Sequence, residues 1–281
     1  MKYEQDCSVN CNYRAKIASS AGSVAFKRKT LQCLFAGLFS LSLNLYAADS
    51  ALVAAASDLQ FALEEVAQQF TQETGLPIKF SFGSSGNFAR QITQGAPYEL
   101  FMSADEKYVL ELAKQHKTID EGLLYAIGRL VLYAPKGSVL KVDSEMQGLG
   151  QALKNGEIKR FAIANPDHAP YGHAAKAALI SFGLWDSIQP QLVLGENVAQ
   201  AAQFAISDST QGGIFAYALV LSPKLKPDGN CALLPENSHP PLKQRMVLTT
   251  KAGATAKAFY AFLQLPKTKA ILQRFGFNSP Q

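Results

Sequence analysis

The sequence predicts an α/β fold in which short apolar strands alternate with amphipathic helices. Residues 52–56, LVAAA, form an apolar run typical of a buried parallel strand. Apolar side chains then recur at helical spacing, at Leu59, Leu63, Val66 and Phe70. Gly75 marks the expected end of that helix. The same strand–helix order recurs along the chain, and it favours an open sheet with helices on both faces.

Two more strand–helix pairs are predicted before residue 120. Residues 78–82, IKFSF, alternate apolar and polar side chains and predict a strand. Its helix is expected after Gly86 and should end near Gly95. Residues 99–103, ELFMS, form the next predicted strand, and Asp105 is the expected start of the helix that follows.

Residues 125–134, YAIGRLVLYA, form an apolar run that is long for one strand. Such a strand can begin in one lobe and finish in another. A second alternating series follows, with strands expected at 161–164, 191–194, 213–215, 230–234 and 245–250 and helices at 172–182, 197–206, 254–265 and 267–275. We therefore predict two doubly wound lobes, one from residues 48–129 and 243–281 and the other from 130–242. The hinge is expected near 129–132 and 245–250.

Residues 1–47 have the layout of a secretory leader. A basic cluster at 27–29, KRK, precedes an apolar run from Leu31 to Tyr46, and Ala47 offers a small residue for cleavage. The run is short for a membrane span. We expect a cleaved leader and an exported mature chain that starts at Ala48, with an uncleaved N-terminal anchor as the alternative. Only Cys231 of the four cysteines would remain, so the mature chain would form no internal disulfide.

The charge balance argues against a nucleic-acid partner. The net charge of +5 comes mostly from the leader, because residues from 48 onward carry 21 basic and 20 acidic side chains. The mature part contains no cluster of lysine and arginine of the kind that phosphate backbones require.

Four strand-to-helix junctions share a composition suited to binding an anion: 56–58 (ASD), 84–86 (SSG), 169–172 (APYG) and 196–199 (ENVA). In open α/β sheets ligands bind beyond the carboxyl ends of the strands, where helix N-termini present free N–H groups. None of the four contains lysine or arginine. This combination predicts a fully ionised oxyanion held by neutral donors, and a site made only of donors would reject a protonated one. Asp58 is expected to present its backbone N–H inward and to turn its side chain outward as a helix cap.

These junctions, together with other motifs, resemble the periplasmic molybdate-binding proteins of molybdate ABC transporters. The matching segments run in order from 54 to 277: AAAS at 54–57, FGSSG at 82–86, QGAPY at 94–98, FMSAD at 101–105, YAIGRLVL at 125–132, ANP at 164–166, APYG at 169–172 and RFGF at 274–277. The resemblance implies a two-lobed type II periplasmic binding protein that closes on its ligand in the cleft between the lobes. It also implies a periplasmic location and a membrane permease as partner.

Carried over motif by motif, the residues that contact the oxyanion are Ser57, Asp58, Ser85, Tyr171 and Val198. Asp58 and Val198 would contact it through the backbone. They would bind the oxygens of molybdate or tungstate, with no direct ligand to the metal atom, no cofactor and a monomeric chain. Some family members have a tyrosine ligand where this chain has Ala216. We expect the hydroxyl of Tyr171 to replace it, because Tyr217, adjacent in a predicted strand, should face away.

Three alternatives compete with this prediction. Within the binding class, another tetrahedral oxyanion such as sulfate is the main one, and a sensor domain of the same fold is more distant. A serine hydrolase would use Ser85 as its nucleophile, but Asn87 breaks the G-x-S-x-G motif.

His168 and His173 have a spacing that only weakly suggests a metal site, and both are expected to be solvated.

Overall fold

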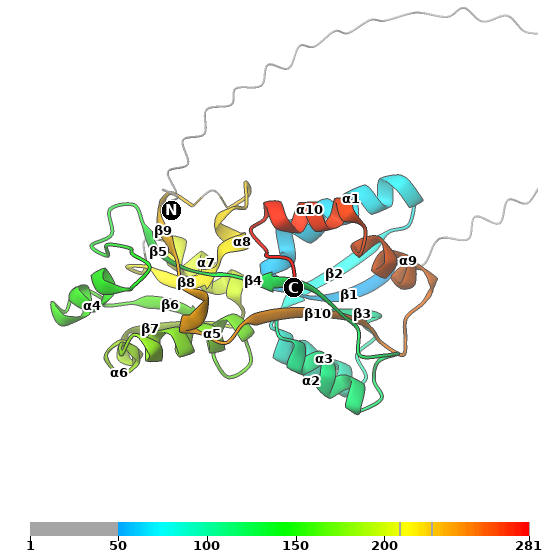
Figure 1. The fold of residues 1–281 in the computed structure, drawn as a ribbon, viewed down its shortest axis with the longest axis horizontal. Helices are drawn as coiled ribbons and strands as arrows, with labels where there is room; N and C mark the ends of the chain where they lie inside the picture. The colour runs from blue at the N-terminus through cyan, green and yellow to red at the C-terminus, as the bar shows by residue number, and fades with distance from the viewer. Residues whose placement is uncertain (1–49, 208, 226, 281) are drawn as a thin grey trace, which may run out of the picture. The chain divides into compact units, whose positions relative to one another are not determined.

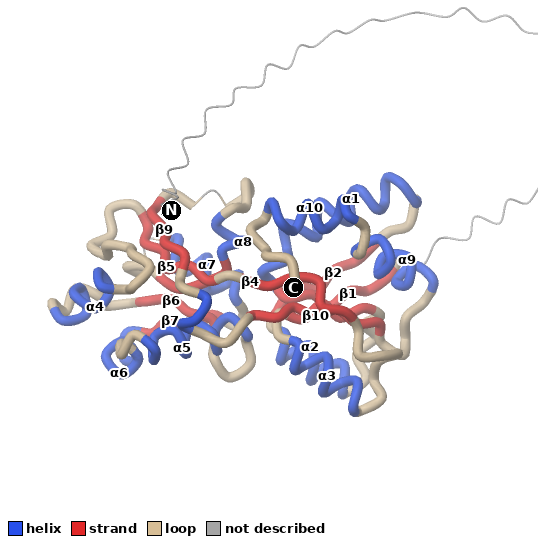
Figure 2. Tube along the Cα trace, viewed as in Figure 1, coloured by secondary structure: helices blue, strands red, loops and turns tan. Residues whose placement is uncertain are grey.

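The computed structural model describes residues 50–207, 209–225 and 227–280, shown in Figures 1 and 2. The predicted leader, 1–47, lies outside the described residues. In the described part of the chain no helix is long and apolar enough to cross a membrane.

Lobe 1 is built around a five-stranded sheet in the order β2-β1-β3-β10-β4. Its strands are β1 (Ala51–Ala56), β2 (Ile78–Gly83), β3 (Leu100–Ser103), β4 (Leu123–Gly128) and β10 (Leu242–Leu248). β1 pairs in parallel with β2 and β3, whereas β10 runs antiparallel to both of its neighbours. The almost uniformly buried β1 and β3 confirm the apolar runs predicted from the sequence.

Helices cover both faces of the lobe 1 sheet, as Figure 1 shows. One face carries α1 (Gln60–Thr74), α9 (Ala254–Leu263) and α10 (Pro266–Arg274), and the other carries α2 (Ser85–Thr93) and α3 (Glu106–Lys114). On the first face the ring of Phe70 packs edge-on against Phe259 and Phe262, with centroids 5.1 and 5.3 Å apart. Gly75 ends α1 in the left-handed conformation, as predicted.

Lobe 2 repeats this plan around the order β7-β6-β8-β5-β9. The strands are β5 (Leu130–Pro135), β6 (Phe161–Ala164), β7 (Leu192–Gly195), β8 (Gly213–Ala216) and β9 (Gly229–Leu233). Its helices are α4 (Gln147–Lys154), α5 (Pro170–Ser181), α6 (Trp185–Ile188), α7 (Val198–Ile206) and α8 (Tyr217–Val220). Short 3-10 turns lie at Ser57–Leu59, Gln189–Gln191 and Glu236–Ser238. The predicted α/β class with two sheets is confirmed, while the bounds proposed for each lobe stay a prediction.

The apolar run 125–134 begins in lobe 1 and finishes in lobe 2, as predicted. It is two strands and not one, because the chain leaves the lobe 1 sheet after Gly128 and joins the lobe 2 sheet at Leu130. The return to lobe 1 precedes Leu242, which pairs with Gly128. Residues 245–248 pair with β3 inside the lobe 1 sheet, so the hinge predicted at 245–250 is wrong and the crossing lies just before β10.

Two helix starts also differ from prediction. Helix α5 begins at Pro170, not at 172, because proline is preorganised for the first helical position and needs no N–H acceptor there. Tyr217 is the first residue of α8 and does not continue strand β8, so the expectation based on alternating strand side chains is wrong for it.

Candidate functional site

The four predicted junctions meet in one pocket between the lobes. The pocket is lined by Ala56, Ser57, Asp58, Gly83, Ser84, Ser85, Ala104, Ala169, Pro170, Tyr171 and Val198. All five predicted contact residues are among them, and no lysine or arginine is. The cavity measures only about 10 Å³, roughly the room of one water. A larger oxyanion therefore requires the walls to move apart.

The topology explains why these junctions meet. β1 and β2 are parallel neighbours in register, with Ala56 beside Gly83, so their carboxyl ends lie at one edge of the lobe 1 sheet. β6 and β7 are likewise parallel, with Ala164 beside Gly195. The loops that leave these strand ends face each other across the cleft.

Each of three helices brings an unused N–H group to the pocket. Ser85 and Val198 are the first residues of α2 and α7, and Tyr171 is the second of α5, so none has an intrahelical acceptor. In the described part of the chain these three N–H groups have no other acceptor. At α7 the Asn197 side chain accepts from the N–H groups of Ala199 and Gln200, at 3.0 and 3.1 Å, and leaves that of Val198 free. What remains is a set of three donors suited to an anion.

The two serine hydroxyls of the site differ in whether their hydrogen is free to donate. Ser85 Oγ accepts the N–H of Ala104 at 3.0 Å, which leaves its own hydrogen free to donate. Ser57 Oγ donates to Asn197 Oδ1 at 3.0 Å and accepts the N–H of Ala199 at 3.2 Å, both across the cleft. Ser85 is therefore ready to bind an anion, whereas Ser57 must first release Asn197.

Further hydrogen bonds join the two lobes beside the pocket. The backbone oxygen of His168, from lobe 2, accepts from the N–H of Gly86 at 3.1 Å and from the hydroxyl of Ser84. The His168 ring lies 3.0 Å from the same hydroxyl and 3.5 Å from a carboxylate oxygen of Glu196. The side chain of Asn87 donates to Glu196 as well. These contacts join the lobes, so the structure represents a closed arrangement.

The side chain of Asp58 points into the protein and is only 2% exposed. Its Oδ2 accepts from Gln244 Nε2 at 2.5 Å, while Oδ1 is buried without a hydrogen-bond partner. The expectation that this side chain caps the helix outward is therefore wrong. Gln244 Nε2 also donates to the hydroxyl of Tyr171 at 3.2 Å, and the Tyr125 hydroxyl donates to Gln244 Oε1 at 2.8 Å. This buried network joins β4, β10 and α5 to the pocket wall.

Burial dominates the electrostatics of the network. It raises the pKa of Asp58 from 3.8 to about 6, against the opposing hydrogen bonds from Gln244, Tyr171 and local N–H groups. Burial, and then the charge of Asp58, also raise the pKa of Tyr125 and of Tyr171 well above the usual value. Both phenols are therefore neutral near pH 7. An acceptor in the pocket also contradicts the prediction of a site made only of donors.

Gly128 is required where β4 ends beside this network. A Cβ atom there would lie 2.3 Å from the Tyr171 hydroxyl and 2.9 Å from Gln244 Nε2. Only glycine lets the phenol of lobe 2 rest against the last residue of β4.

The model of the bacterial extracellular solute-binding protein family matches residues 51–278. The chain belongs to this family. The molybdate-binding protein ModA of Rhodobacter capsulatus is 33% identical over 267 residues, which cover 88% of this chain and 97% of the relative. ModA of Escherichia coli is 36% identical over 256 residues, which cover 87% and 96%.

The solved periplasmic molybdate-binding protein of Azotobacter vinelandii has the same fold. It aligns with a TM-score of 0.75 and 33% identity, over 83% of this chain and all of that one. The two-lobed type II fold and the ModA relationship inferred from the sequence motifs are thereby confirmed. The match to solute-binding proteins also disfavours the serine hydrolase alternative.

Sequence reasoning missed two residues of this solute-binding protein's pocket region. Gln244 is fully buried, 186 residues from Asp58, and an isolated glutamine in a strand gives no signal of a site. His168 was expected to be solvated, but its side chain is only 16% exposed and lies between the lobes. Its position two residues before Pro170, in a loop already assigned to the pocket, could have indicated this.

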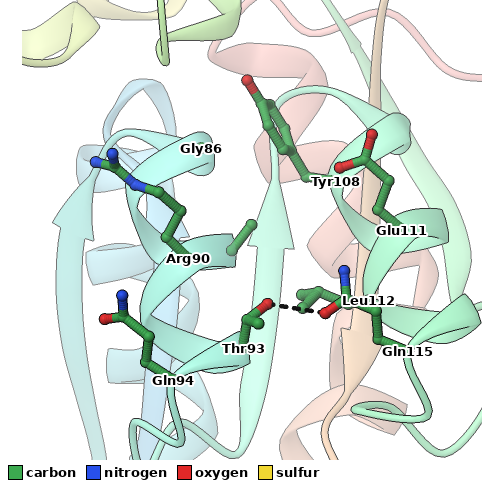
Figure 3. Close-up of a pocket in the computed structure, with 9 residues that line it drawn as sticks. Gly86, Arg90, Thr93, Gln94, Tyr108, Glu111, Leu112 and Gln115 are labelled. Atoms are coloured by element: carbon green, nitrogen blue, oxygen red, sulfur yellow. Dashed lines mark hydrogen bonds between the residues drawn. The ribbon is translucent and has the colours of Figure 1, made fainter.

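A separate hollow of about 320 Å³ lies between α2 and α3 (Figure 3). Arg90 lines it, and Thr93 and Gln115 join its walls through a 3.1 Å hydrogen bond. Arg90 is not among the residues lining the pocket between the lobes. Among the described residues no group of three or more His, Cys, Asp or Glu side chains could hold a metal ion.

Proposed function

We propose that this protein binds molybdate between its lobes and delivers it to the membrane permease of an ABC transporter. The observation that carries the proposal is that one pocket collects Ser57, Asp58, Ser85, Tyr171 and Val198, the positions taken from the molybdate-binding motifs. Relatives 33–36% identical over most of the chain are named molybdate-binding proteins, which supports the same ligand.

The binding mode follows from the donors. Three N–H groups at helix N-termini and the Ser85 hydroxyl bind oxygens of the oxyanion, and Ser57 joins them once it releases Asn197. Hydrogen bonds to charged groups contribute roughly 1.5–3 kcal/mol each, so a few neutral donors suffice without lysine or arginine. No residue binds the metal atom, and no cofactor or catalytic step is needed. Tungstate, which has the same charge and nearly the same size, should bind as well.

The test is calorimetric titration of the mature chain with molybdate, tungstate, sulfate and phosphate. Molybdate and tungstate should bind, and Ser85→Ala should weaken molybdate by roughly 1.5–3 kcal/mol because its hydroxyl hydrogen is free to donate. Ser181→Ala, on the exposed end of α5, is the matched control and should bind as the parent does. Tight binding of sulfate with none of molybdate would reject the proposal in favour of the sulfate alternative.

The leader pattern in the sequence of residues 1–47 supports a periplasmic location and cleavage before Ala48, which we include in the proposal. We also propose that the mature protein is a monomer. The intact mass of the exported protein tests the cleavage site. A membrane-bound product that retains residues 31–46 would contradict it.

A further inference from the structure

The carboxyl group of Asp58 is the one feature of the pocket that a site for an ionised oxyanion does not explain. Asp58 lines the pocket beside Ser57, the residue is almost wholly buried, and its Oδ1 atom has no hydrogen-bond partner. A buried carboxylate oxygen without a donor is costly. A dianion brought next to an ionised carboxylate would be repelled, so the two cannot share the pocket unless a proton lies between them.

Hydrogen bonds from Gln244, Tyr171 and local N–H groups partly stabilise the charged form of Asp58, but none of its described neighbours brings a positive charge to it. From β10 it meets only the neutral amide of Gln244, and the next residue, Arg245, pairs with Glu106 instead. From β4 and α5 it meets the phenols of Tyr125 and Tyr171, both neutral.

The remaining elements around the pocket add no cation either. Helices α7 and α8 contain no charged residue, and Glu196, before α7, faces His168 and is 61% exposed. Arg90 on α2 donates to Asn87.

We propose that the Asp58 carboxyl group binds one oxygen of the oxyanion through a single proton, so that each dianion is captured together with one proton from solvent. The inference rests on the proposed function, since it concerns the same pocket. The proton adds to the ionised carboxylate as the anion enters, the resulting O–H donates to an anion oxygen, and the proton returns to water when the anion leaves. Gln244 positions the carboxyl by holding Oδ2, which leaves Oδ1 for the proton.

The inference fixes the sign of the pH dependence. Burial already raises the pKa of Asp58 to about 6, and a bound dianion raises it further. Between these two pKa values the free site is ionised and the occupied site is protonated. The Kd for molybdate should therefore be constant below about pH 6 and rise about tenfold per pH unit above it.

The experiment is calorimetric titration with molybdate from about pH 6 to pH 8.5, in two buffers of different ionisation enthalpy. The parent chain should take up close to one proton per anion near pH 7.5. Asp58→Asn replaces the shared proton by a permanent N–H donor, so it should take up none, keep one Kd across the range and bind more tightly than the parent at the upper end. Asp105→Asn is the matched control, because Asp105 caps α3 outside the pocket and asparagine caps as well. It should keep the proton uptake of the parent.

The outcomes separate the two proposals. Molybdate binding without proton uptake and with a Kd independent of pH would overturn the role of Asp58 and leave the proposed function intact. Asp58→Asn that still takes up a proton would assign the uptake to another group. Absence of molybdate binding at every pH would reject the proposed function itself.

Discussion

At the scale of single residues, the buried carboxyl group of Asp58 lowers the stability of the folded protein when it is ionised. Its folded-state pKa of about 6 exceeds the usual 3.8, so the folded protein binds more protons between these values and loses stability as pH rises through them. About two pKa units correspond to about 3 kcal/mol, lost in full above about pH 6. Asp58→Asn should stabilise the ligand-free protein near pH 7 by up to that amount, with little gain near pH 4. Urea unfolding at the two pH values measures this, and an equal gain at both would contradict it.

At the same scale, Tyr171 has a backbone N–H without an acceptor and a hydroxyl in the buried network. Its hydroxyl accepts from Gln244 and is buried, so Tyr171→Phe leaves an amide hydrogen unsatisfied and should weaken molybdate binding by about 1 kcal/mol. Tyr217→Phe is the control, because Tyr217 does not line the pocket and the Arg129 guanidinium lies over its ring, 5.4 Å from the centroid. Titration calorimetry compares them. If Tyr171→Phe binds like the parent, the residue acts through its N–H alone.

At the scale of elements, the end of β4 controls how closely the lobes approach. Gly128→Ala places a methyl group 2.3 Å from the Tyr171 hydroxyl, which must move away together with lobe 2. Overpacking of this kind costs roughly 1–3 kcal/mol, so molybdate should bind about tenfold more weakly or worse. Gly150→Ala in α4 is the control, since its Cβ would meet only Leu184 at 3.4 Å. Isothermal titration measures both variants, and unchanged affinity in Gly128→Ala would mean that closure does not need this contact.

At the scale of the whole molecule, the two lobes should close on the ligand. The closed arrangement is held by polar contacts between lobes, from Gly86 and Ser84 to His168. The connections between the lobes are short segments at Arg129 and just before Leu242. We expect the ligand-free chain in solution to adopt an open arrangement that admits the anion. An anion that contacts both lobes then favours closure, because it binds the closed form better. Small-angle scattering should show a smaller radius of gyration with molybdate. A constant radius at saturation would argue against closure.

The sequence by itself determined the elements and the junctions of this protein. Apolar runs, helical spacing and glycine or proline at the ends act over a few residues, so β6, α1 and the start of α3 at Asp105 could be predicted from the chain alone. Parallel strands place their carboxyl ends at one edge, and that rule predicted a shared pocket for the four junctions, which the structure contains.

Only the tertiary structure decided what the pocket contains beyond those junctions. The direction of the Asp58 side chain depends on Gln244, which arrives on β10 after the chain has crossed into lobe 2 and returned. The run 125–134 is apolar throughout except for Arg129 and a glycine, so its sequence does not show where it breaks. The break lies at Arg129 because the residues before it pair with β10 in lobe 1 and the residues after it pair with β8 in lobe 2. Such choices are made by hydrogen bonds and burial between residues that lie far apart in the sequence, such as Leu130 and Ala216 or Asp58 and Gln244, and no local pattern records them.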